Sequence, residues 1–126
     1  MRSVFALLLL GLSAGCAAAQ APPSYVVFFQ EWSAALDEPA NGVIGHAAAW
    51  AKTHPGMTIQ VTGFADPTGS RKANVLISEL RAQVVVDQLA TDGIDPSRIS
   101  QVGEGSVQPA LSTQESRRVQ VSFHAR

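Results

Sequence analysis

The stretch from Thr62 to Ala82 constrains the fold of this chain more than any other. It begins at the end of an apolar–polar alternation, Thr58 to Thr62, which is typical of a half-buried strand. A loop bounded by Gly63 and Gly69 follows, and glycine permits backbone angles and close approaches that other residues resist. Ser70 is then a suitable N-cap for a helix. The stretch therefore predicts a strand, a glycine-flanked loop and a helix in direct succession.

The rest of the chain continues this alternation of strands and helices. We expect two helices, one that begins after Asp37 and ends at Thr53 to Gly56, and one from Ser70 to about Thr91. We expect four strands, at Tyr25 to Phe29, at Thr58 to Thr62, at Ile99 to Val102, and through Val119, Val121 and Phe123. Strands interleaved with helices predict an α/β fold. The expected architecture is a two-layer sandwich with a mixed sheet of about four strands and two main helices.

Helical spacing also predicts which faces of the two helices are buried. The first helix is expected to bury Val43, Ala47, Trp50 and Ala51, and the second Ile77, Ala82, Val85 and Leu89. Gly93, just beyond the second helix, is a typical helix-ending residue.

The first 19 residues have the outline of a secretory signal peptide. Arg2 precedes an apolar run, Val4 to Leu12, which small residues follow. A run of roughly ten apolar residues is well short of the ~20 that a spanning helix needs. We therefore expect a leader over residues 1–19, a short linker over residues 20–24 and one folded domain over residues 25–126.

Two cleavage sites fit the end of this leader. Cys16, the single cysteine, follows Leu12 to Gly15 in a pattern that resembles the lipobox of bacterial lipoproteins, although the leucine lies one place too far upstream. Cleavage before a lipidated Cys16 would leave an anchored protein. Ala17 to Ala19 offers an alternative site, with cleavage before Gln20 and a soluble secreted product.

Composition argues against several classes of function. Of 9 basic side chains only Arg2 lies in the leader, so 8 remain against 10 acidic ones, a formal net charge of −2 that disfavours nucleic-acid binding. His46, His54 and His124 form no metal-binding motif, and no serine lies in a nucleophile motif. We expect a protein that is not an enzyme and carries no cofactor or metal.

Four sequence motifs point to a known family. They are Gly63-Phe64-Ala65-Asp66 with Gly69, then Asn74, then Ile77-Ser78-Glu79-Leu80-Arg81-Ala82, and finally Ser116-Arg117-Arg118-Val119. In type and spacing these motifs resemble the OmpA-like C-terminal domain family, whose members bind the peptide stem of peptidoglycan without altering it. The resemblance covers nearly the whole chain after the leader, from about Tyr25 to Phe123.

The resemblance implies a ligand and a set of residues for it. Asp66 would accept hydrogen bonds from the ammonium of diaminopimelate in the stem peptide, and Arg81 would bind its carboxylate. By position, Asn74 would hydrogen-bond the loop or the ligand, and Arg117 would line the far side. Thr68 and Gly69 complete the expected site. The protein would tether the outer membrane, through Cys16, or an envelope complex to the cell wall.

Departures from the family pattern leave a second function open. Phe64 and Ala65 replace a histidine and a threonine, and Ser116 replaces an asparagine. The segment between Pro109 and Arg117 is shorter than usual, and Trp32 stands where some relatives carry a polar contact residue. The alternative is therefore an envelope protein–protein interaction module of the same fold that no longer binds peptidoglycan.

Overall fold

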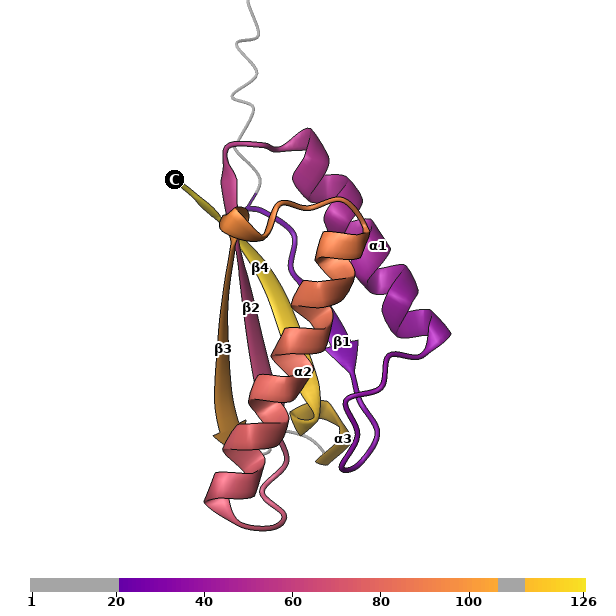
Figure 1. Ribbon diagram of the computed structural model, residues 1–126, viewed down its shortest axis with the longest axis vertical. Coiled ribbons are helices and arrows are strands. Elements are labelled where there is room, and N and C mark those ends of the chain that lie inside the picture. Colours follow the sequence, from indigo (N-terminus) through magenta and orange to yellow (C-terminus); the bar gives the residue numbers. More distant parts are fainter. Residues whose placement is uncertain (1–20, 107–112) are drawn as a thin grey trace, which may run out of the picture.

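The computed structural model describes residues 21–106 and 113–126 (Figure 1). In chain order the elements are β1 (Tyr25–Phe28), α1 (Glu38–Thr53), β2 (Met57–Ala65), α2 (Arg71–Thr91), the 3-10 helix η1 (Pro96–Arg98), β3 (Ile99–Ser106), α3 (Thr113–Ser116) and β4 (Arg118–Ala125). The expected leader, both of its cleavage sites and Cys16 lie outside the described residues, as do Pro109 and the first three residues of the shortened segment that follows it.

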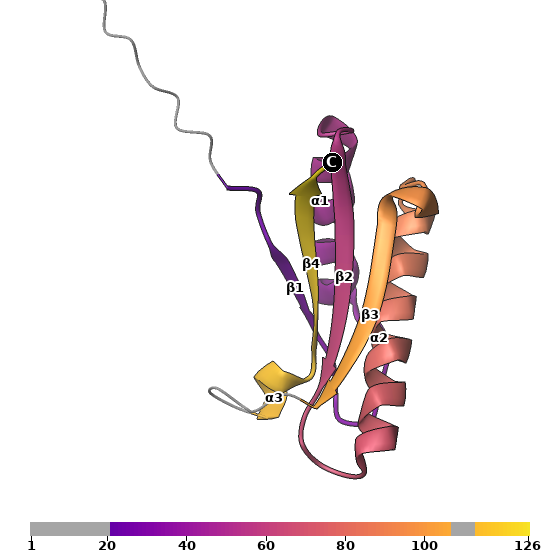
Figure 2. The same ribbon diagram turned by 90° about the vertical axis from the view of Figure 1, so that its left-hand side faces the viewer.

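The four strands form one mixed sheet in the order β1-β4-β2-β3. β4 pairs antiparallel with both β1 and β2, whereas β2 and β3 are parallel. Helices α1 and α2 pack against the same face of this sheet (Figure 2). The core between the two layers includes Val27, Ile59, Val121 and Leu89. The predicted two-layer α/β sandwich with two main helices is therefore confirmed.

Both main helices begin where their predicted N-caps place them. The Asp37 carboxylate accepts a hydrogen bond from the Ala40 amide at 2.8 Å, and the Ser70 hydroxyl accepts one from the Ala73 amide at 3.1 Å. Beyond α2, Gly93 has a φ of +100°, a conformation that glycine adopts without steric cost. No helix among the described residues is long and apolar enough to cross a membrane.

Two strands are longer than their sequences predicted, and glycine explains both differences. β2 continues through Gly63 to Ala65, and β3 continues through Gly103 to Ser106. A Cβ atom on Gly63 would lie 2.0 Å from the Ser78 carbonyl oxygen of α2. One on Gly103 would lie 2.6 Å from the Glu79 amide nitrogen. These glycines do not end the strands; they let α2 lie close to the sheet.

The buried stripe of α2 changes from apolar to polar toward the helix start. Ala82, Val85 and Leu89 are buried as predicted, but Ile77 is only half-buried. The buried positions of the first half are taken by Asn74, Ser78 and Arg81. The prediction for Ile77 was wrong because it assumed an apolar contact along the whole helix. This half of α2 instead packs on a polar network beside the end of β2.

Candidate ligand-binding site

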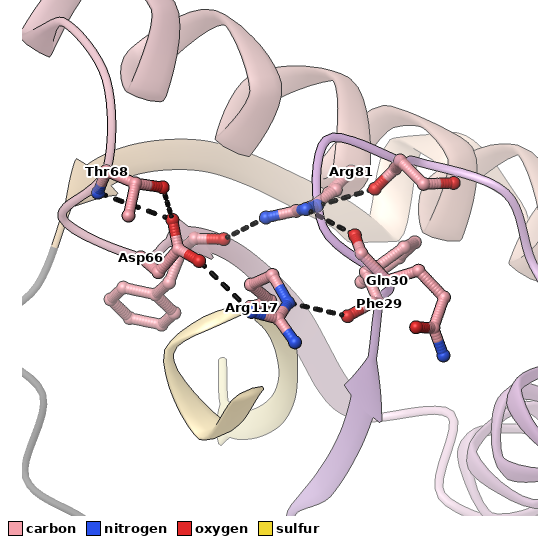
Figure 3. Close-up of polar contacts among 8 residues, drawn as sticks. Phe29, Gln30, Asp66, Thr68, Arg81 and Arg117 are labelled. Carbon is pink, nitrogen blue, oxygen red and sulfur yellow. Dashed lines mark hydrogen bonds and ion pairs between the residues drawn. The ribbon is translucent and has the colours of Figure 1, made fainter. Parts of the chain in front are cut away.

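The candidate site lies at the end of the molecule where β2 passes into α2. Asp66 directly follows β2, and Arg117 lies between α3 and β4, 51 residues further along the chain. Arg81 reaches the same region from α2, and the turn after β1 borders it (Figure 3). The antiparallel pairing of β4 with β1 and β2 is what brings Arg117 beside Asp66.

Asp66 is largely buried and has three polar contacts. Its Oδ2 atom accepts a hydrogen bond from Arg117 Nη1 at 3.1 Å, which is also an ion pair. Its Oδ1 atom accepts one from the Thr68 hydroxyl at 2.5 Å and one from the Thr68 amide at 3.4 Å. Burial alone raises the pKa of Asp66, but the hydrogen bonds from Thr68 and Arg117 outweigh it, so the pKa is lowered. Asp66 is therefore a carboxylate at neutral pH.

Arg117 joins the carboxylate of Asp66 to the end of β1. Its Nε atom donates to the Phe29 carbonyl at 3.2 Å, and its own carbonyl accepts from the Phe29 amide at 2.9 Å. The side chain keeps 15% of its surface exposed, against 8% for the side chain of Asp66. Arg117 is thus the more accessible member of the ion pair.

Arg81 is 1% exposed and donates to three backbone carbonyls. Nε donates to Ser33 at 2.8 Å, Nη2 to Gln30 at 3.0 Å and Nη1 to Phe64 at 3.2 Å (Figure 3). Burial lowers the pKa of the Arg81 guanidinium; the charge of Asp66 partly offsets this effect, and the charge of Arg117 adds to it. A guanidinium has five N–H groups, so two of them are not used in these bonds.

Asn74 and Gly69 lie on the helix side of the loop. The side-chain Nδ2 atom of Asn74 donates to the Ser106 hydroxyl at 2.9 Å. The Oδ1 atom of the same side chain is buried without a partner among the described residues. Gly69 has a φ of +83°. A Cβ atom there would lie 2.7 Å from the Trp32 ring and 3.9 Å from Asn74 Oδ1. The Trp32 ring and the unpaired Asn74 oxygen therefore both lie on one side of the loop at Gly69.

The structure thus brings all six predicted site residues around one loop, but in unequal ways. Thr68 and Arg117 both donate hydrogen bonds directly to Asp66. Arg81 is close enough for its charge to act on Asp66, yet its described hydrogen bonds go to the main chain. Its assignment to a ligand carboxylate remains a prediction.

Sequence reasoning missed the turn from Gln30 to Ser33 as part of the site. The Ser33 amide donates to the Gln30 carbonyl at 3.2 Å, and both residues offer their carbonyls to Arg81. Backbone carbonyls have no sequence signature, because every residue carries one. The one available indication was that Trp32, which lies within this turn, stands where some relatives carry a polar contact residue. The structure leaves it 52% exposed.

Two guanidinium groups, Arg81 and Arg117, lie by one carboxylate, Asp66, so these three largely buried groups carry a formal charge of +1. A second carboxylate, the exposed Glu31, belongs to the turn before Trp32. Phe64, which stands where the family pattern has histidine, adds no charge, and the Arg118 guanidinium lies over its ring at 4.3 Å. Within the described ranges no cluster of three or more histidine, cysteine, aspartate or glutamate side chains is placed to hold a metal ion.

Comparison with known proteins identifies the family to which the chain is similar. The family model described as "OmpA family" matches residues 28–121. The chain is 30% identical over 112 residues to a peptidoglycan-associated lipoprotein of Legionella pneumophila, covering 84% of this chain and 64% of that protein. It is 31% identical over 103 residues to the probable lipoprotein YiaD of Escherichia coli, covering 77% and 47% respectively. It is 34% identical over 70 residues to the peptidoglycan-binding protein ArfA of Mycobacterium tuberculosis, covering 56% and 22%.

Solved structures show the same fold. The peptidoglycan-associated lipoprotein of Burkholderia pseudomallei superposes with a TM-score of 0.75 at 22% identity, over 79% of this chain and 90% of that one. The OmpA-like domain of FopA1 from Francisella tularensis gives 0.71 at 19% identity, over 82% and 75%. The chain itself spans 64% and 47% of the length of the two lipoprotein relatives above.

Proposed function

The chain belongs to the OmpA family, and from this we propose that it binds peptidoglycan without altering it chemically. Support comes from its relatives, which include peptidoglycan-associated lipoproteins and a peptidoglycan-binding protein. The family match runs from the last residue of β1 into β4 and so includes the whole candidate site. Binding rather than catalysis also suits the site, whose polar groups are two arginines, an aspartate, a threonine and an asparagine.

The observation that carries this proposal is the ion pair between Arg117 and Asp66, which lies in the loop that follows β2. A partly buried charged pair presents both an acceptor and a donor to an incoming group. We propose that the ligand is the stem peptide and that its diaminopimelate centre meets this pair, with an ammonium near Asp66 and a carboxylate near the arginines. A fixed pair of opposite charges favours such a zwitterion over a neutral group.

We further propose that the protein tethers the outer membrane, or an envelope complex, to the cell wall. The site and residues 21–24, which precede β1, lie at opposite ends of the sheet (Figure 1). Pro22 and Pro23 line a cleft with Trp50 and Met57, where β2 begins, whereas Asp66 follows its last residue. An anchor at Cys16, which lies outside the described residues, would leave the site directed away from the membrane and toward the wall.

The test is sedimentation of the chain from residue 20 onward with insoluble diaminopimelate-type peptidoglycan. We expect the wild type to sediment and the Asp66→Ala and Arg117→Ala variants to remain in solution. Arg118→Ala is the matched control, because Arg118 is the adjacent arginine and packs on Phe64 without a described contact to Asp66. Thermal unfolding of each variant checks that it is folded.

One observation favours the alternative of a protein–protein interaction module. The charged groups of the site already satisfy one another and the main chain, and Arg81 is 1% exposed. A folded wild type that stays in solution with peptidoglycan would exclude wall binding and leave this second function. Sedimentation of the wild type that the Asp66→Ala and Arg117→Ala variants lose would exclude the alternative, because it would show that the site still binds the wall.

A further inference from the structure

Trp32 has a conformation and an exposure that packing alone does not explain. It has a φ of +49°, in the left-handed region that bulky residues rarely occupy, and no other non-glycine residue in the described ranges has a positive φ. It also keeps 52% of its surface exposed. Backbone strain of this kind persists where the surrounding structure holds it in place, and it is concentrated at functional sites.

The surrounding structure that holds Trp32 is part of the candidate site. Trp32 lies within the turn that the Ser33 amide closes on the Gln30 carbonyl. Arg81 donates to the carbonyls of both of these residues and also to that of Phe64, two residues before Asp66. One buried guanidinium therefore fixes the turn of Trp32 and the strand end of Asp66 relative to each other.

The indole edge closes on the loop of the site. Trp32 Cη2 and Cζ2 would lie 2.7 Å and 2.9 Å from a Cβ atom built on Gly69, so this position accepts glycine alone without displacing the ring. Asn74 Oδ1, which is buried and has no partner among the described residues, approaches the same side of Gly69. A half-exposed indole and an unused acceptor thus lie together beside Gly69, three residues after Asp66.

We infer that Trp32 is a specificity-determining residue whose indole forms an apolar wall of the ligand site and packs against an aliphatic segment that adjoins a carboxylate. The inference rests on the proposed peptidoglycan binding. The electrostatic part of the inference comes from Arg81, Arg117 and Asp66, whose summed charge of +1 favours an anion beside the two arginines. Its apolar part comes from the exposed indole, which gains free energy when an aliphatic chain covers it. The methylene chain and terminal carboxylate of diaminopimelate have this chemistry.

Affinity measurements on Trp32 variants test the wall directly. The probe is a soluble stem tripeptide that ends in diaminopimelate. It is titrated by calorimetry into the chain from residue 20 onward. For Trp32→Ala we expect about tenfold weaker binding, because roughly 50 Å² of apolar contact is lost. Trp32→Phe keeps an aromatic wall and should lose less. Trp32→Gly relieves the positive φ, so its midpoint of thermal unfolding should not fall below that of Trp32→Ala, although its binding should be equally weak.

Tryptophan fluorescence provides a second measurement, because the chain has two tryptophans. Trp50 lies at the other end of the sheet, stacked on His54 with ring centroids 3.7 Å apart. In a Trp50→Phe variant, Trp32 is the sole tryptophan, and saturating tripeptide should shift its emission to the blue and reduce its quenching by acrylamide. The matched Trp32→Phe variant, which retains Trp50, should show neither change.

The outcomes separate this inference from the function on which it rests. Failure of the wild type to bind the tripeptide or the cell wall overturns both. Binding that Asp66→Ala abolishes but Trp32→Ala leaves unchanged overturns the wall and preserves the proposed function. Equal affinity for a tripeptide whose terminal carboxylate is amidated overturns the carboxylate preference. A tenfold loss in Trp32→Ala together with weaker binding of the amidated peptide supports the inference in full.

Discussion

At the scale of single residues, the two arginines of the site have different tasks. Arg81 is 1% exposed and donates to three carbonyls, whereas the Arg117 side chain is 15% exposed and pairs with Asp66. Loss of either weakens ligand binding under our proposal, but loss of Arg81 also leaves buried carbonyls without donors. Arg117 is therefore the better residue for testing ligand binding, and Arg81 the better one for testing how the site is held together.

Replacement of Arg81 by lysine should destabilise the fold. An ammonium keeps the charge but cannot reach three carbonyls in the fixed planar geometry of a guanidinium. We expect a loss of about 2–4 kcal/mol in the free energy of unfolding, measured by urea denaturation. Arg71→Lys, an exposed substitution on the same helix, is the matched control and should change stability by less than about 0.5 kcal/mol. Equal stability of the two variants would contradict the structural role of Arg81.

Asp66 should make the stability of the domain depend on acid pH. Its pKa is lowered in the folded state from the ordinary value of 3.8, so its ionised form stabilises the fold above that value. This contribution is lost as the pH falls through the lowered pKa. Thermal unfolding from pH 7 to pH 2 should therefore show a smaller decrease below about pH 4 in Asp66→Asn than in the wild type. Identical pH profiles of the two proteins would contradict the lowered pKa.

At the scale of elements, the contact of α2 with the sheet depends on glycine. Gly63 and Gly103 lie in neighbouring strands in register with each other, and both face the backbone of α2. Without side chains at these two places, the start of α2 can approach the sheet closely enough to bury Asn74, Ser78 and Arg81. The hydrogen bond from the Gly105 amide to the Ser78 hydroxyl, at 2.9 Å, belongs to the same contact. The close approach of the β2 and β3 backbones thus holds the polar half of α2 in place.

Gly103→Ala should move α2 away from the sheet. The new Cβ would lie 2.6 Å from the Glu79 amide nitrogen and 2.8 Å from its Cα atom, and backbone atoms cannot give way as a flexible side chain can. We expect destabilisation of about 1–3 kcal/mol by urea denaturation. Gly42→Ala is the control, since that helical position has no atom within 4 Å of a new Cβ. It should stabilise the domain by up to about 1 kcal/mol. Destabilisation by Gly42→Ala, or none by Gly103→Ala, would contradict this packing.

At the scale of the whole molecule, the sheet separates the N-terminal segment from the candidate site. β2 has nine residues, Met57–Ala65, and at about 3.3 Å per residue it spans roughly 30 Å. Pro22 and Pro23 lie beside its start, and Asp66 follows its end. A domain held by its N-terminal segment therefore presents the site at its far end, which suits a tether.

Attachment through either end of the molecule tests this arrangement. The chain from residue 20 onward has no cysteine, so a single new one can be coupled to a surface. Through Ser24→Cys, next to the N-terminal segment, the domain should still bind solubilised peptidoglycan fragments in surface plasmon resonance. Through Pro67→Cys, next to Asp66, binding should fall to background because the surface blocks the site. Equal binding in both orientations would place the ligand elsewhere.

The sequence by itself determined the alternation of elements, and with it the fold. Apolar periodicity, the Asp37 and Ser70 caps and Gly93 each act over a few residues, so they can be recognised without the rest of the chain. The same holds for the motifs around Asp66, Arg81 and Arg117, which indicated the family that the comparisons confirmed.

Only the tertiary structure decided how those motif residues are used. The pairing of Asp66 with Arg117 depends on strand pairing across 51 residues, and the bond from Arg81 to Gln30 also spans 51. Ile77 was expected in the core, but the close approach of α2 at two glycines buried polar neighbours instead. Trp32 became part of the site through the folding of a turn onto Gly69. Such contacts join distant main-chain atoms, and main-chain atoms are the same in every residue, so no local pattern encodes them.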